Sequence, residues 1–165
     1  MTFDYGPTHP LSRLASVKLT WALSALTKPT HRKSKDPEVY DRFEKIVLVH
    51  GCRQVSELAY GERLVRNLET DELFGPILKD KLIYYPTVTR EPFRNRGRIT
   101  DLITSERLFN DVDLKPLDIE TDRLMLCGSP SMLEDLRRIF KERGFAEGNH
   151  SEPGHFVIEK AFVER

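Results

Sequence analysis

Short hydrophobic runs alternate with amphipathic stretches along most of the chain. The run at residues 45–51 (KIVLVHG) consists mainly of aliphatic and β-branched side chains and closes with a glycine. Apolar runs of this length are typical of strands that are buried on both faces of a sheet. By the same pattern, the predicted strands are residues 45–51, 81–88, 122–128 and 155–163.

Amphipathic stretches between these strands predict helices. Ser56 and Ser131 stand where N-caps belong, and Gly144 stands where a glycine commonly ends a helix. The predicted helices are residues 56–67, 72–79 and 132–143, with a short helix or turn at 99–108. Strands that alternate with helices predict an α/β fold with a parallel sheet. Ligands of such sheets bind beyond the carboxyl ends of the strands.

The composition of the chain changes near residue 35. Residues 28–37 are polar and basic and contain two prolines, which is typical of a loop or linker. We therefore divide the chain into an atypical N-terminal segment at residues 1–35 and a folded domain at residues 36–165. Residues 11–26 are moderately apolar, but charged residues interrupt them. They predict neither a signal peptide nor a membrane span of about 18 apolar residues, and we expect a cytoplasmic protein.

Charge and cysteine content exclude several classes of protein. The 26 basic and 26 acidic residues give a formal charge of +0, so no overall field favours nucleic acid or an anionic membrane. Any anion site must therefore be a local cluster. Two cysteines are too few for a disulfide scaffold and fit a reducing compartment. The five histidines show no ligand spacing with the cysteines, so we predict no metal site.

Arginine concentrates just after the predicted strand at residues 81–88. The cluster consists of Arg90, Arg94, Arg96 and Arg98. Arg53 follows the strand at residues 45–51 in the same way. Guanidinium groups donate paired hydrogen bonds to phosphate oxygens, and the hydroxyl of Thr89 adds a neutral donor. The alternative is a solvated basic loop balanced by nearby carboxylates. Because the arginines lie at two strand ends, we favour a phosphate site.

A second candidate site is the turn from Cys127 to Pro130, which precedes a predicted helix. Free backbone N–H groups and the helix dipole favour an anion at a helix N-terminus, and Gly128 lets a ligand approach the backbone. The alternative is a simple strand-to-helix turn in which Cys127 is a small buried hydrophobe. The residues of the turn alone favour that alternative.

Five motifs in order resemble one family. They are VHGCR, YYPTVTRE, NRGRITDLI, RLMLCGSPSML and GHFVIEKAFVE, and they run from about residue 36 to residue 165. Together they resemble the NADP(H)-binding domain of bacterial ferredoxin–NADP(+) reductases. The resemblance implies a flavoprotein oxidoreductase that passes electrons between NADPH and ferredoxin or flavodoxin through FAD.

The resemblance also implies roles for individual residues. The positions that match those holding the 2′-phosphate and adenosine end of NADP(H) are Arg53, Thr89, Arg90 and Arg98. The residues expected along the pyrophosphate and nicotinamide are Gly128, Ser129 and Met132, with Cys127 near the hydride-transfer centre. Phe162 lies in a tail that is expected to pack near the flavin. Family members often have an aliphatic residue at the position of Cys52, which we interpret as a tolerated core substitution.

Two parts of the family pattern are not found in the sequence. One is the N-terminal β-barrel that binds FAD; the other is the first strand of the nucleotide domain with its Gly-Thr-Gly-Leu-Ala-Pro-like turn. In the family, that strand is normally the central one, between the strands that correspond to residues 45–51 and 122–128. Residues 1–34 look unlike the family. Residues 14–26 are apolar enough to fill part of the gap as a helix or a substitute strand.

Two classes of function therefore stay open. The chain is either a reductase part, whose flavin domain comes from elsewhere such as a separate chain, or a non-catalytic NADP(H)-binding module or inactive truncated product. RNA binding through residues 90–98 is a weaker reading, because the net charge is zero and no known RNA-binding module is present.

Overall fold

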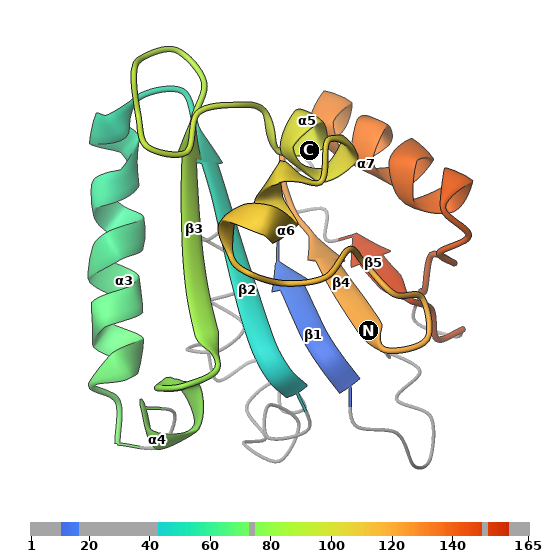
Figure 1. Cartoon of the computed structure of the whole chain (residues 1–165), viewed down its shortest axis with the longest axis horizontal. Helices are drawn as coiled ribbons and strands as arrows, with labels where there is room; N and C mark the ends of the chain where they lie inside the picture. Colours follow the sequence, from blue (N-terminus) through green and yellow to red (C-terminus); the bar gives the residue numbers. More distant parts are fainter. Residues whose placement is uncertain (1–10, 17–42, 73–74, 150–151, 159–165) are drawn as a thin grey trace, which may run out of the picture.

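The computed structural model describes residues 11–16, 43–72, 75–149 and 152–158. Within these ranges, five parallel strands form one sheet in the order β3-β2-β1-β4-β5 (Figure 1). The strands are β1 (Leu11–Ser16), β2 (Phe43–Cys52), β3 (Leu82–Val88), β4 (Asp122–Leu126) and β5 (Phe156–Ile158). The parallel α/β fold predicted from the sequence is confirmed.

Strand β1 occupies the centre of this sheet. Ala15 pairs with Val47 of β2 on one side and with Leu124 of β4 on the other. The sheet therefore has a strand at the position where the sequence predicted a gap. The predicted filler, residues 14–26, overlaps β1 only in part, and residues 17–26 lie outside the described residues. The observed strand begins at Leu11, before the predicted filler. Pairing with a neighbour on each side stabilises this six-residue segment, although polar side chains interrupt it.

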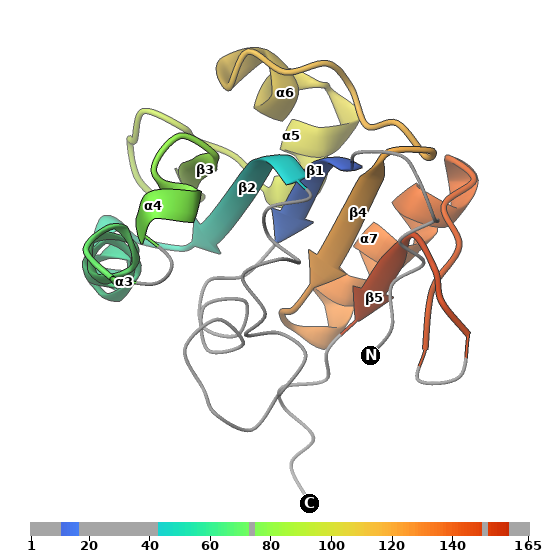
Figure 2. The same cartoon turned by 90° about the horizontal axis from the view of Figure 1, so that it is seen from below.

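Helices cover the sheet unequally. The helical elements are η1 (Val55–Leu58), α3 (Ala59–Glu69), α4 (Gly75–Leu78), α5 (Ile99–Thr104), α6 (Arg107–Asp111) and α7 (Pro130–Glu142). Helices α5, α6 and α7 lie over one face, and α3 lies beside β3 at the edge (Figures 1 and 2). Side chains from α5, α6 and α7 pack with β2, β3, β4 and β5 in one hydrophobic core.

Several predicted helix boundaries differ from the structure. Helix α7 begins at Pro130 and is capped by Ser129, not Ser131, because proline suits the first turn of a helix. Ser56 lies inside a 3₁₀ turn that leads into α3, so it is not an N-cap. The single element predicted at residues 99–108 is divided into α5 and α6, since Glu106 adopts a left-handed backbone conformation (φ 62°).

Other predicted boundaries agree closely or are shortened. Gly144 follows α7 with φ 86°, as a C-terminal glycine should. The helix predicted at residues 72–79 is the single turn α4, and residues 73–74 are outside the described ranges. The last strand is described only for Phe156–Ile158, and the rest of its predicted range, residues 159–163, lies outside the described residues.

The central position of β1 predicts a strong effect of proline at Ala15. Proline has no backbone N–H and cannot continue the ladder of a central strand. The carbonyl left unpaired would cost about 1–3 kcal/mol before any steric strain is added. We expect Ala15→Pro to lower the urea midpoint sharply or to prevent folding.

Amide hydrogen exchange of the unmodified chain gives an independent test of the same point. Amides of β1 should exchange as slowly as those of β2 and β4, and more slowly than those of the edge strand β5. Fast exchange throughout β1 would contradict a central strand there.

Candidate nucleotide site at the carboxyl ends of the strands

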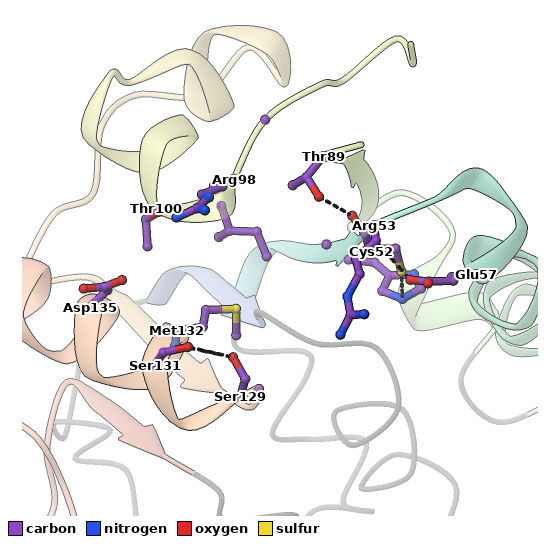
Figure 3. A pocket seen from close by; sticks show the side chains of 15 residues that line it. Cys52, Arg53, Glu57, Thr89, Arg98, Thr100, Ser129, Ser131, Met132 and Asp135 are labelled. Carbon is purple, nitrogen blue, oxygen red and sulfur yellow. Dashed lines mark hydrogen bonds between the residues drawn. The ribbon is translucent and has the colours of Figure 1, made fainter. Parts of the chain in front are cut away.

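A cleft of about 500 Å³ opens beyond the carboxyl ends of β2, β3 and β4 (Figure 3). Segments that follow three different strands supply its walls. The lining residues are His50, Gly51, Cys52, Arg53, Glu57, Thr89, Gly97, Arg98, Ile99, Thr100, Gly128, Ser129, Ser131, Met132 and Asp135. The cleft therefore lies where parallel α/β sheets bind their ligands, and its volume is within the usual range for small-molecule sites.

Backbone hydrogen bonds join the ends of β2 and β3. The Thr89 N–H donates to the Cys52 carbonyl at 3.1 Å, and the Arg90 N–H donates to the Arg53 carbonyl at 2.9 Å. The Thr89 hydroxyl also donates to the Cys52 carbonyl, at 3.3 Å. These bonds hold Arg53 and Thr89 side by side on one wall of the cleft.

The loop after β3 folds back and delivers Arg98 to the cleft. The Val88 N–H donates to the Asn95 carbonyl, and the Gly97 N–H donates to the Val88 carbonyl, at 3.2 and 3.1 Å. Thr87 is buried, and its hydroxyl donates to the Gly97 carbonyl at 2.8 Å. Gly97 has φ 148°, a conformation that L side chains rarely adopt. The chain therefore reaches α5 with Arg98 at its N-cap position and beside the cleft.

Two guanidinium groups of the cleft have no partner among the residues that the structure describes. Arg53 and Arg98 are exposed, and within the described part of the chain neither side chain forms a hydrogen bond or an ion pair. Other arginines of the same fold are paired: Arg137 donates to Glu147 at 3.0 Å, and Arg138 lies 3.4 Å from Glu142. The cleft thus presents two cations whose donors are available to an anion.

The opposite wall is the turn between β4 and α7. The Ser129 hydroxyl accepts a hydrogen bond from the Met132 N–H at 3.5 Å and so caps the helix. A Cβ atom at Gly128 would lie 1.9 Å from the terminal methyl of Met132. The Met132 thioether therefore lies directly against Gly128, and any larger residue there would displace it. The first turn of this 13-residue helix adds N–H groups and the positive end of its dipole.

The structure gathers most of the predicted site residues in this one cleft. Those that line it are Arg53, Thr89, Arg98, Gly128, Ser129 and Met132. Arg90 is exposed and outside the lining, although its backbone is bound to Arg53. Cys127 is 3% exposed and likewise does not line the cleft. Phe162 lies outside the described residues.

Some lining residues were not predicted. Glu57 and Asp135 place two exposed carboxylates on the rim, and Glu57 accepts a hydrogen bond from the Arg53 N–H at 3.0 Å. Both lie within helical elements, so only the folded chain brings them to the strand ends. The interpretation of Cys52 as a core substitution was wrong: its side chain is half-buried and lines the cleft. Its place near the end of β2 was the signal that could have shown this.

A chain of hydrogen bonds runs from Cys52 into the sheet. The Cys52 sulfur lies 3.0 Å from His50 Nε2, and His50 Nδ1 lies 3.0 Å from the Tyr84 hydroxyl. Burial, followed by the charges of Glu62 and Cys52, raises the pKa of Tyr84 to about 12, while Arg94 acts in the opposite direction. Tyr84 is therefore a neutral phenol at physiological pH.

A parallel sheet with a cleft at its strand ends, lined by cationic side chains, is the arrangement of a nucleotide-binding domain. The chain is 52% identical over 132 residues to the ferredoxin–NADP reductase of Azotobacter vinelandii, a match that covers 79% of this chain and 51% of that protein. It is 48% identical over 158 residues to the ferredoxin–NADP reductase A of Sorangium cellulosum, covering 94% of this chain and 57% of the relative. Over most of its length the chain is homologous to the C-terminal part of these ferredoxin–NADP reductases. It spans about half the length of these curated relatives.

A solved structure supports the same fold. The crystal structure of a ferredoxin NADP+ reductase from Neisseria gonorrhoeae with bound FAD and NADP superposes with a TM-score of 0.68 at 22% identity, covering 93% of this chain and 57% of that one. No protein-family model matches the chain. The Sorangium match covers 94% of this chain, so it reaches well into residues 1–34, which the sequence had predicted to be unlike the family.

Two further observations concern the described residues alone. No helix in them is long and apolar enough to cross a membrane. No group of three or more histidine, cysteine, aspartate or glutamate side chains in the same ranges is arranged to hold a metal ion.

The raised pKa of Tyr84 predicts a specific dependence of stability on pH. An unfolded tyrosine loses its proton near pH 10, whereas folded Tyr84 keeps its proton until about pH 12. The free energy of unfolding should therefore fall as pH rises from 10 to 12, because the unfolded chain releases this proton first. In urea titrations over this pH range, the free energy of unfolding of Tyr84→Phe should fall less steeply. Identical slopes above pH 10 in the two proteins would contradict the raised pKa.

Proposed function

We propose that this chain is the NADP(H)-binding part of a ferredoxin–NADP reductase, which exchanges electrons between NADPH and ferredoxin or flavodoxin through FAD. The observation that carries the proposal is the pair of guanidinium groups on the cleft, Arg53 and Arg98, which have no partner in the described ranges. The names of the relatives and the NADP bound in the Neisseria structure support it. A cytoplasmic location stays a prediction.

The 2′-phosphate is the part of NADP(H) that we assign to the arginine wall. A phosphate needs fixed cations, whereas the ribose 2′-hydroxyl of NAD(H) is usually bound by a carboxylate. Arg53 and Arg98 supply these cations from the ends of two neighbouring strands. The Thr89 hydroxyl makes a long bond of 3.3 Å to the Cys52 carbonyl, so a phosphate oxygen competes well for it. Arg90 would join them through a side-chain rotation towards the cleft.

The wall formed by α7 fits the pyrophosphate and nicotinamide end. Ser129 and the first-turn N–H groups offer neutral donors, and Gly128 allows close approach to the backbone. Met132 would move from its place against Gly128 as the nucleotide enters, since its thioether is flexible. Cys127 is buried beside Gly128 and does not line the cleft, so it would meet the nicotinamide only if the ligand displaced the residues that cover it.

FAD is the second cofactor that the proposed function requires. When bound, FAD accepts the hydride and releases single electrons. The residues expected to meet it, including Phe162, lie outside the described part of the chain. We therefore assign to the described residues only the binding and orientation of NADP(H). The alternative function is an NADP(H)-binding module without turnover.

Substitution of the cleft arginines tests the phosphate assignment. Loss of a hydrogen bond to a charged group costs about 1.5–3 kcal/mol, so Arg98→Ala and Arg53→Ala should each weaken 2′,5′-ADP binding by roughly 10- to 100-fold. Binding of 5′-AMP should change little, because it has no 2′-phosphate. Calorimetry with both ligands measures the difference.

The matched control is Arg66→Ala, which removes an exposed arginine of α3 that does not line the cleft. It should leave both affinities unchanged. Equal losses for both ligands in the cleft variants would overturn the assignment. Arg90→Ala, measured beside them, shows whether that side chain turns inward.

Flavin retention separates the two functions. A purified chain that carries FAD and reduces an artificial acceptor with NADPH supports a reductase part. A colourless chain that binds NADP(H) and gains no such activity on addition of FAD supports the non-catalytic module. Absorbance at 450 nm and a dye-reduction assay decide between them.

A further inference from the structure

Cys52, His50 and Tyr84 form a cluster of ionisable groups on one face of the sheet. His50 and Cys52 are two residues apart on β2, so their side chains point to the same face. Tyr84 lies on β3, where it pairs with Leu48, again two residues from His50. The Cys52–His50 and His50–Tyr84 distances are both 3.0 Å. His50 is buried and Cys52 is half-buried, and both line the cleft.

The geometry makes His50 a proton acceptor for the thiol. In the tautomer that donates from Nδ1–H to the Tyr84 oxygen, Nε2 is the acceptor that lies against the Cys52 sulfur. Proton transfer from the thiol to this nitrogen would give a thiolate beside an imidazolium. Tyr84 cannot take the proton onward in neutral solution, because it is already protonated. A base that adjoins a thiol in this way is the usual means of activating a cysteine.

The charges around the cluster come from several elements. Arg53 follows Cys52 directly, and Glu57 of η1 lines the same cleft. Glu62 of α3 and Arg94 of the loop after β3 act on Tyr84. The groups near the cluster therefore include both cations and carboxylates. Of these groups, the His50 imidazole lies within hydrogen-bonding distance of the sulfur.

We propose that Cys52 is a nucleophilic thiol that hydrogen peroxide and related hydroperoxides oxidise to a sulfenic acid. Cys52 gives its proton to His50 Nε2, and the thiolate attacks one peroxide oxygen. The S–O bond forms as the O–O bond breaks. The hydroxide that leaves takes the proton from His50 and departs as water. Sulfur is oxidised by two electrons, and the peroxide is reduced by two.

Oxidation at this position would also affect the cleft. The added oxygen would lie on the wall that carries Arg53 and Thr89, where the hydroxyl of the sulfenic acid competes for the same donors. We therefore expect oxidised chain to bind 2′,5′-ADP more weakly. This second effect rests on the proposed function, whereas the reactivity of the thiol does not.

Trapping with dimedone and mass spectrometry measures the reaction in the full chain. An ordinary thiol is only a few per cent ionised at pH 7, so activation should make Cys52 react with peroxide roughly tenfold faster than cysteine in an unstructured peptide. Cys127, which is 3% exposed, is the internal control and should remain unmodified. A Cys52 rate no greater than that of the peptide would overturn the proposal.

Two variants test whether His50 accepts the proton of the Cys52 thiol. His50→Asn should reduce the rate to that of the peptide and move the pH profile of alkylation by iodoacetamide to that of an ordinary thiol. Tyr84→Phe keeps the aromatic ring but removes the hydroxyl that contacts His50, so it should slow the reaction by a smaller factor. It is the test variant if His50→Asn does not fold. Rates and pH profiles unchanged in a folded variant of either kind would overturn the activation.

The effect on the cleft is measured separately. The affinity for 2′,5′-ADP is determined before and after peroxide treatment, with Cys52→Ala as the variant that should show no change on treatment. Fast oxidation with unchanged affinity overturns the effect on binding. A chain that oxidises quickly yet binds no nucleotide in its reduced form overturns the proposed function and confirms the reactive thiol.

Discussion

The pairing of β1 with both β2 and β4 is the constraint on which the rest of this structure depends. Without it, β2 with β3 and β4 with β5 would be two separate pairs of strands. With it, the carboxyl ends of β2 and β4 come to one edge of a continuous sheet. Arg53 and Gly128, which are 75 residues apart in the chain, then line a single cleft.

The cleft divides its chemistry between two walls. On one wall, backbone hydrogen bonds hold the segments after β2 and β3 together, and the side chains of Arg53 and Arg98 pair with none of the described residues. On the other wall, the capped start of α7 offers N–H groups beside Gly128. Since the formal charge of the whole chain is +0, the anion preference that we propose would come from this local arrangement.

Elements with a strong local pattern were predictable, and those that depend on tertiary contacts were not. Strands β2, β3 and β4 contain short apolar runs that the sequence pattern predicts, and the rule that ligands bind at strand ends then located Arg53 and Arg98. Strand β1 has six residues with polar interruptions, and its pairing, which no local pattern contains, makes it central. The positions of Glu57 and Asp135 on the rim depend on how helices pack. The exposure of Cys52 depends in the same way on how strand ends meet.

A direct test of this account locates the 2′-phosphate on the folded chain. Amide and arginine Nε resonances are compared in NMR spectra of the chain with 2′,5′-ADP and with 5′-AMP. The account predicts that the differences between the two ligands concentrate at Arg53, Thr89 and Arg98. Differences that concentrate instead at the start of α7, or away from the cleft, would contradict it.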